Sequence, residues 1–148
     1  FKFQRNLAAG RLLSGLMIEA LAERPPAALP ERLICVPLHP QRLRERGYNQ
    51  ALELAKPLAR ALRIPLDADA LIRLRHTSAQ TGLDAKARRR NLHAAFAVAD
   101  PARLPAHVAV IDDVMTTGTT LRECARVLRQ AGVARVDVWA LARAPARR

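Results

Sequence analysis

The segment 107–142 constrains the fold more than any other part of the chain, because a strand, a helix and a second strand are predicted there in immediate succession. HVAVID, 107–112, is a continuous apolar run ended by an acid, which is typical of a strand buried on both faces. LRECARVLRQAG, 121–132, repeats its apolar residues at helical spacing and ends in glycine. RVDVWALA, 135–142, is the next strand, with Trp139 expected in the core. This succession predicts parallel strands with the helix packed on their sheet.

The rest of the chain continues the alternation of helices and strands. Helical periodicity covers 5–23 and 51–62, and Pro57 should kink the second of these helices. Short apolar segments predict strands at 32–37, 71–75 and 94–98. Charged segments with little apolar periodicity predict loops at 39–50 and, as a long mobile segment, at 76–91. The expected fold class is α/β, a mainly parallel central sheet flanked by helices, in a single domain over 1–148.

Asp112 and Asp113 are the only adjacent acid pair in the chain, and they come directly after the buried strand. In parallel α/β sheets, ligands bind beyond the carboxyl ends of the strands, so the pair is expected at the ligand edge. Consecutive strand side chains point to opposite faces. We therefore expect one carboxylate to reach ligand hydroxyls or a metal-bound water and the other to hold the following loop.

The segment MTTGTT, 115–120, leads from the acid pair into the predicted helix. Its backbone N–H groups and the positive end of the helix dipole predict an anion site, which Gly118 allows a ligand to approach closely. Threonines add hydroxyl donors there; they are Thr116, Thr117, Thr119 and Thr120. A phosphate site beside two acids suits a sugar phosphate: the loop would bind the phosphate, and the carboxylates would bind the two ribose hydroxyls. The alternative is that Thr120, in a capping box with Glu123, only caps the helix and the acids only solvate a loop.

Basic residues outnumber acidic ones by 25 to 13, giving a net charge of +12, and 22 of the 25 are arginine. Arginine prefers planar, bidentate partners, which predicts a phosphorylated ligand or nucleic acid. The alternative is the codon bias of a GC-rich genome. Aromatic residues make up only 3% of the chain, which counts against base stacking as a main binding mode. Arg42, Arg44 and Arg46 alternate, so an extended loop would present them together, either to pyrophosphate or to solvent.

Cys35 and Cys124 are the only cysteines, and neither belongs to a CxxC pair. A zinc site is therefore not expected, and a reducing cytoplasm is the expected location. No apolar run approaches the length of a membrane span, and no signal peptide is visible. The histidines at 76, 93 and 107 lack metal-ligand spacing.

Three stretches resemble a known family. VAVIDDVMTTGTTL, 108–121, closely resembles the phosphoribosyl-pyrophosphate (PRPP) motif of type I phosphoribosyltransferases, which is an apolar strand, two acids and a T-G-x-T phosphate loop. VPLHPQRLRERGYNQALELA, 36–55, and RHTSAQTGLDAKARRRNLHAAF, 75–96, resemble the ComF/GntX branch of these enzymes. Together the resemblance covers nearly the whole chain. Many full-length members begin with a cysteine-rich zinc segment, and no such cluster occurs in 1–148.

The resemblance implies a type I phosphoribosyltransferase fold in which 76–91 forms a mobile hood. It implies that Asp112 and Asp113 face the ribose hydroxyls of PRPP or ribose 5-phosphate, and that Thr116 to Thr120 hold the 5′-phosphate. The loop from Leu38 to Arg42, which includes His39, would take the pyrophosphate. Mg²⁺ would be the cofactor, held near the acids through water and PRPP rather than by direct protein ligands.

The implied reaction is Mg²⁺-dependent transfer of a phosphoribosyl group to a nitrogen nucleophile with release of pyrophosphate. Two other functions stay open. One is a non-catalytic sensor of PRPP or nucleotide that acts through a partner protein in competence, the uptake of DNA. The other is direct nucleic-acid binding by a competence factor, for which the net charge is the motivation.

Overall fold

The computed structural model describes residues 7–25, 27–75, 86 and 94–144, and its centre is a parallel sheet. Four strands pair in the order β2-β1-β5-β6; they are β1 (Arg32–Cys35), β2 (Leu66–Asp67), β5 (His107–Met115) and β6 (Arg135–Arg143). All three pairings in this sheet are parallel. The predicted parallel sheet is confirmed. The predicted hood at 76–91 lies, apart from Lys86, outside the described residues.

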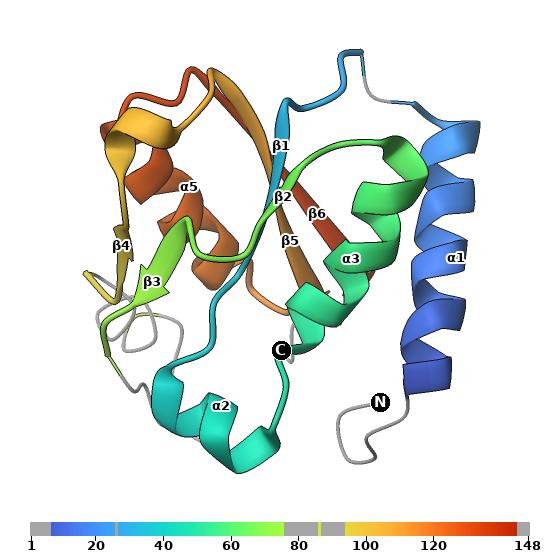
Figure 1. The fold of residues 1–148 in the computed structure, drawn as a ribbon, viewed down its shortest axis with the longest axis horizontal. Coiled ribbons are helices and arrows are strands. Elements are labelled where there is room, and N and C mark those ends of the chain that lie inside the picture. Colours follow the sequence, from blue (N-terminus) through green and yellow to red (C-terminus); the bar gives the residue numbers. More distant parts are fainter. Residues whose placement is uncertain (1–6, 26, 76–85, 87–93, 145–148) are drawn as a thin grey trace.

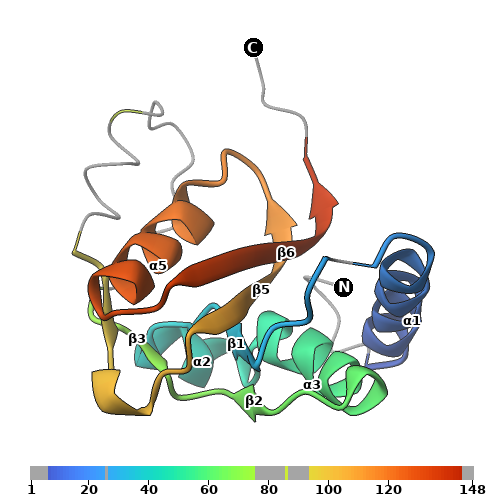
Figure 2. The ribbon, with the colours of Figure 1, turned by 90° about the horizontal axis from the view of Figure 1, so that it is seen from above.

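Helices cover both faces of the sheet (Figure 1). On one face lie α1 (Leu7–Glu23) and α3 (Gln50–Leu62), and on the other lies α5 (Thr119–Gln130). Viewed from above, the sheet runs between α5 and the α1–α3 pair (Figure 2). The α3 helix contains Pro57 and continues past it. No helix in the described part of the chain is both long and apolar enough to cross a membrane.

The core consists of two clusters that β5 separates. Val108 and Val110 point into the cluster on the α5 side, while Ala109 and Ile111 point into the cluster on the α3 side. All four residues have 0% exposure, because helices cover the strand from both sides. Trp139 of β6 is buried in the α3-side cluster, as predicted.

Two predicted strands form a separate hairpin. The strands β3 (Leu71–Arg73) and β4 (Phe96–Val98) are shorter than the predicted 71–75 and 94–98, and they pair with each other in antiparallel fashion. A short 3₁₀ turn, η1 (Pro101–Arg103), then leads toward β5. The hairpin lies on the same side of the sheet as α5 (Figure 1).

The prediction of a loop over 39–50 is wrong, because residues 40–46 form the helix α2 (Pro40–Arg46). Capping residues specify its ends. His39 accepts the Gln41 N–H through Nδ1 at 3.2 Å, and Pro40 is the first helical residue, where the fixed φ of proline already suits a helix. Gly47, at φ 79°, ends the helix with its N–H on the Leu43 carbonyl. The helix carries no buried residue, so apolar periodicity is a poor guide to it. The three arginines at 42, 44 and 46 are therefore helical rather than extended.

Asn49 is the N-cap residue of α3 and also ties that helix to the sheet. Its Oδ1 accepts the N–H groups of Ala51 and Leu52, at 3.0 and 3.5 Å. Its Nδ2 donates to the carbonyl of Val36, which follows β1, at 3.0 Å. The segment 37–48, which includes α2, is thus held at both ends by a single side chain.

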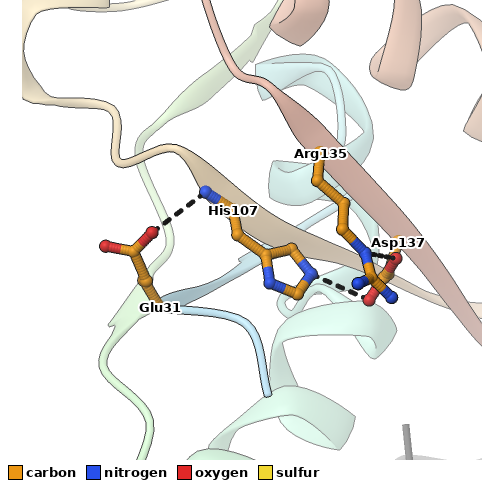
Figure 3. A network of polar contacts seen from close by, with 4 residues as sticks. All are labelled: Glu31, His107, Arg135 and Asp137. Carbon is orange, nitrogen blue, oxygen red and sulfur yellow. Dashed lines mark hydrogen bonds and ion pairs between the residues drawn. The ribbon is translucent and has the colours of Figure 1, made fainter. Parts of the chain in front are cut away.

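At the amino end of β5, a polar network joins β5, β6 and the residue before β1 (Figure 3). His107 Nε2 lies 2.9 Å from an Asp137 oxygen, and Arg135 Nε donates to the other oxygen at 3.1 Å. Glu31, just before β1, accepts the backbone N–H of His107 at 3.2 Å. Burial opposes the charge of Asp137, but the hydrogen bonds from His107 and Arg135 outweigh it and lower its pKa. His107, without metal spacing in the sequence, thus has a structural role between β5 and β6.

Asp137→Asn should destabilise the protein in a pH-dependent way. Because the pKa of Asp137 is lowered in the fold, its stabilising effect is present above its unfolded pKa, near 4, and is lost as pH falls through the folded value. The variant should lose about 1–2 kcal/mol of unfolding free energy at pH 7, as expected for partly exposed charge-assisted hydrogen bonds. Urea unfolding at pH 7 and pH 3 measures this. Asp69→Asn, at an exposed carboxylate, is the control; an equal loss in both variants would contradict the network's role.

Candidate functional site

The acid pair lies within β5, close to its carboxyl end. The strand was expected over 107–112, but it continues to Met115, and β6 pairs with it along this extension, with Asp112 opposite Ala140 and Val114 opposite Ala142. Asp112 and Asp113 are half-buried, whereas Val114 is 45% exposed. The carboxylates thus occupy the point where the helices cease to cover the strand.

Each carboxylate of the pair is held by the backbone that follows it. Asp112 Oδ1 accepts the N–H of Asp113, and Asp113 Oδ1 accepts the N–H of Val114, both at 2.9 Å. By the strand period of two, Asp112 shares the α5-side face with Val110. These short-range bonds restrict the side-chain torsions of both aspartates, and the two side chains also interact with each other.

Asp112 has an unusual protonation equilibrium. Burial, together with the neighbouring Asp113 carboxylate, raises the pKa of Asp112 to about 7. The N–H of Asp113 and the charge of Arg73 act in the opposite direction but do not cancel these effects. Near neutral pH this group therefore exchanges between acid and carboxylate, and any cation or hydrogen-bond donor that joins it will favour the carboxylate.

The predicted phosphate loop connects β5 to α5. Gly118 is the N-cap residue at φ 77°, a left-handed conformation that favours glycine. Thr117 and Thr119 hydroxyls lie 2.7 Å apart, and the Thr119 N–H reaches Thr117 Oγ1 at 3.4 Å. The first bond of the helix runs from the Arg122 N–H to the Gly118 carbonyl, at 2.9 Å. The N–H groups of the first turn thus point out of the helix beside the acid pair, which is the arrangement that binds anions.

The predicted capping box of Thr120 and Glu123 is wrong. Thr120 is the second residue of α5, and the N-cap Gly118 has no side chain to bond. Glu123 instead forms an ion pair with Arg126, one turn on, and accepts the backbone N–H of Ala94 at 3.3 Å. Glu123 therefore connects α5 to the start of the β4 segment rather than closing the helix end.

The loop expected to take pyrophosphate lies at the same sheet edge as the acid pair. Cys35 of β1 pairs with Ile111 of β5, and the Val36 N–H continues the ladder to the Ile111 carbonyl at 3.0 Å. The chain from Leu38 to Arg42 follows directly, with Leu38, His39 and Arg42 all half-buried. Because β1 and β5 are parallel neighbours, this loop and the acid pair lie at adjacent strand ends.

One residue of this edge escaped the sequence analysis. Arg73, the last residue of β3, is half-buried, and its guanidinium carbon lies 5.2 Å from the centre of the Phe96 ring. The charge of Arg73 acts on Asp112, although the two residues are far apart in the chain. The only signal in the sequence was the alternation of LIRLR, which places Arg73 on the same face as the core residue Leu71.

The donor set at this edge fits a magnesium ion that a ligand shares. Among the described residues, no group of three or more His, Cys, Asp or Glu side chains is arranged to hold a metal. Magnesium commonly takes one or two carboxylates and completes its shell with water and ligand phosphates. Asp112 and Asp113, beside a loop suited to phosphate, would hold such an ion through its water ligands rather than by direct coordination.

Asp112→Asn should stabilise the protein without ligand or Mg²⁺ at high pH. Since the pKa of Asp112 is raised to about 7 in the fold, the protonated form stabilises the protein fully below the unfolded pKa, near 4, and this contribution is lost as pH rises through 7. Asparagine stays neutral and still accepts the Asp113 N–H. At pH 8 the variant should gain at least about 1.4 kcal/mol, the equivalent of one pKa unit, over wild type.

Chemical unfolding at pH 8 and pH 4 measures this difference, which should nearly vanish at pH 4. Asp69→Asn controls for the change in net charge. A gain of the same size at both pH values would show that charge on Asp112 is not what destabilises the fold.

Comparisons with known proteins agree with this geometry. The family model described as the phosphoribosyl transferase domain matches residues 49–148. Competence protein F of Haemophilus influenzae is 44% identical over 149 residues, covering 97% of this chain and 65% of that protein. DNA utilization protein YhgH of Escherichia coli K12 is 40% identical over 145 residues, covering 96% and 63%. The chain thus spans slightly less than two thirds of the length of these relatives.

Solved structures share the fold. Glutamine PRPP amidotransferase from B. subtilis, complexed with ADP and GMP, superposes with a TM-score of 0.59 at 20% identity, covering 91% of this chain and 26% of that chain. The allosteric regulatory enzyme of purine biosynthesis gives 0.56 at 22% identity, covering 89% and 25%. The match of the family model over more than half of the chain shows that the chain belongs to the phosphoribosyl transferase domain family, as its resemblance to the ComF-like phosphoribosyltransferases predicted.

Proposed function

We propose that the protein binds PRPP at the carboxyl edge of β1 and β5 and, with Mg²⁺, transfers its phosphoribosyl group to a nitrogen nucleophile. The observation that carries this proposal is the order of groups along one sheet edge: the acid pair in β5, the Gly118 turn and the first turn of α5. The loop after β1 lies beside them. Phosphate, ribose diol and pyrophosphate each have a chemically suitable neighbour there.

In this proposal the first turn of α5 holds the 5′-phosphate. Its N–H groups and the Thr117–Thr119 hydroxyl pair donate to the phosphate oxygens. The carboxylates of Asp112 and Asp113 accept hydrogen bonds from the ribose hydroxyls and so orient the sugar ring. The segment from Leu38 to Arg42, which ends in the first turn of α2, faces the pyrophosphate, where Arg42 supplies positive charge.

The transfer requires little covalent chemistry from the protein. The bond between ribose C1 and the pyrophosphate oxygen breaks, and its electron pair leaves with pyrophosphate. The nucleophile's nitrogen bonds to C1 and then releases a proton. Mg²⁺, when bound, supplies charge that neutralises the leaving group. The acids stabilise the developing positive charge on the ring, so the chain acts by positioning and electrostatics.

The names of the relatives support a role in the uptake or use of DNA. We propose this role for the present chain, in the cytoplasm, where its two buried cysteines would remain thiols. The same names favour a second candidate function, a non-catalytic PRPP sensor that acts through a partner protein. Direct nucleic-acid binding is weaker, since net charge alone motivates it; failure to shift DNA in a gel at about 50 mM salt would dismiss it.

Pyrophosphate release tests the enzyme against the sensor. The protein is incubated with PRPP, Mg²⁺ and a panel of nitrogen nucleophiles that includes ammonia and nucleobases. Turnover with any of them supports the transferase. Tight PRPP binding without turnover, together with a PRPP-dependent change in captured partner proteins, supports the sensor.

Gly118→Val should abolish most phosphate binding. An added Cβ would lie 3.4 Å from the sulfur of Met115, which is ordinary contact, so the main cost is a β-branched residue at φ 77°. Relaxing that strain moves the N–H groups of the first turn. Affinity for both PRPP and ribose 5-phosphate should fall at least about tenfold, the loss of one charge-assisted hydrogen bond. Calorimetric titration measures it.

Two further variants calibrate that result. Thr117→Val keeps the β-branched shape but removes one hydroxyl, so the loss should be smaller and affect both ligands. Gly15→Val is the matched control, because a Cβ added at this α1 glycine meets no atom within 4 Å. If Gly118→Val binds both ligands as wild type does, the phosphate assignment is wrong.

A further inference from the structure

The α1 helix is apolar on two opposite sides. On its inner side Met17 is buried in the α3-side cluster, and Ile18 and Leu21 pack against that cluster. On its outer side Leu12 is 68% exposed and Leu16 is 51% exposed. Figures 1 and 2 both show α1 at the edge of the molecule, with α3 on one side and no element of the described chain on the other. A helix that is apolar all round is typically covered on both sides, so its outer side is a candidate docking surface.

Four residues form this surface, which we call the α1 outer face; they are Leu12, Gly15, Leu16 and Glu19. Their spacing places them on one side of a helix, because residues three and four apart are neighbours there. Gly15 lies between the two leucines, and a Cβ added to it would meet no atom within 4 Å. An approaching helix can therefore place an apolar side chain directly against the backbone of α1 at Gly15.

The charge of α1 differs from that of the other helices. It contains one basic residue, Arg11, and two acidic residues, Glu19 and Glu23, whereas α2, α3 and α5 each carry a net positive charge. At a net charge of +12, two copies of the chain repel one another. Among the described α-helices, α1 is the one through which two copies repel least. Nucleic acid and anionic membranes bind basic faces, so α1 does not suit them.

The charges on α1 are also arranged symmetrically. Gly15 lies midway between Arg11 and Glu19, which are about 12 Å apart along the helix axis and too far apart to pair within α1. Neither side chain forms an ion pair with another residue in the described part of the chain. Two antiparallel copies of α1 centred on Gly15 would bring each arginine beside the glutamate of the other copy. A parallel arrangement would bring like charges together, so the pattern is complementary to itself only when the helices are antiparallel.

We propose that two copies of this chain dock through the α1 outer face, with their α1 helices antiparallel. The two-fold axis passes near Gly15, the leucines of both copies pack around the two glycines, and each Arg11 pairs with the partner's Glu19. One helix from each copy makes a small contact, below the roughly 1,200 Å² of stable interfaces, so the dimer is weak and reversible. The proposal does not depend on the proposed function, because none of these residues belongs to the sheet edge that holds the acid pair.

The experiment is sedimentation velocity of the chain 1–148 from about 5 to 500 µM, a range in which a weak dimer forms and dissociates. Wild type should pass reversibly from monomer to dimer. The double variant Leu12→Gln, Leu16→Gln should dimerise at least about tenfold more weakly, because each copy loses its two apolar contacts. Its thermal midpoint at low concentration should stay near that of wild type, since both leucines are exposed in the monomer.

Charge reversal tests the antiparallel arrangement. Arg11→Glu alone and Glu19→Arg alone each place like charges side by side and should weaken the dimer about tenfold, as expected when two surface ion pairs become two repulsions. The double reversal restores opposite charges and should dimerise within about threefold of wild type. Arg129→Glu changes the net charge as Arg11→Glu does, at an exposed position on α5, and should not weaken the dimer.

Three results would overturn the proposal. The first is a monomer at every concentration, which is expected if the α1 outer face instead receives a further segment of a longer protein, such as the part of the relatives that this chain does not match. The second is a dimer that the leucine variant does not weaken. The third is a dimer that the double charge reversal fails to restore. Should the leucine variant fail to fold, the charge variants carry the test, because both of their positions are exposed.

Discussion

The burial of β5 between β1 and β6 is the constraint on which the rest of the structure depends. Val108 to Ile111 have 0% exposure, and their side chains alternate between the α5-side and α3-side clusters. Such a strand must be paired on both edges and covered on both faces. Since all its neighbours in the sheet are parallel, their carboxyl ends meet at one edge. The acid pair comes where this burial ends, so the same feature that stabilises the core places the carboxylates beside the turn into α5.

The parts of the fold that were predicted correctly are those whose signals are local and apolar. The buried run of β5, the periodicity of α5 and the stop at Gly132 identify these elements from the sequence alone. Gly132, at φ 105°, ends α5 with the N–H groups of Gly132 and Val133 on carbonyls of the last turn. The α2 helix was missed because it buries no side chain and depends on its two end residues. Charge density, taken as a sign of a loop, was in fact a sign of an exposed helix.

The site was predictable where its residues adjoin in sequence and not where the fold brings them together. Asp112, Asp113 and Gly118 lie along one continuous segment, and the order of residue types identifies them. The spacing of Thr120 and Glu123 satisfies a capping box, yet the left-handed Gly118 starts the helix earlier, and Glu123 meets Ala94, 29 residues away. No local sequence pattern predicts a contact between residues so far apart in the chain. The effect of Arg73 on Asp112 likewise could not be predicted from the sequence, because the two residues are brought together only by the fold.

The electrostatics of the edge connect stability to binding. Burial raises the pKa of Asp112 and lowers that of Arg73, so the fold holds groups of both signs where each is less favourable than in water. The attraction between Asp112 and Arg73 offsets part of this cost. Under the proposed function, PRPP with Mg²⁺ brings hydroxyl donors and positive charge to the acids. Ligand binding would thus favour the carboxylate form of Asp112, which burial disfavours in the free protein, so the group that destabilises the free protein is also one that a ligand of this charge pattern stabilises.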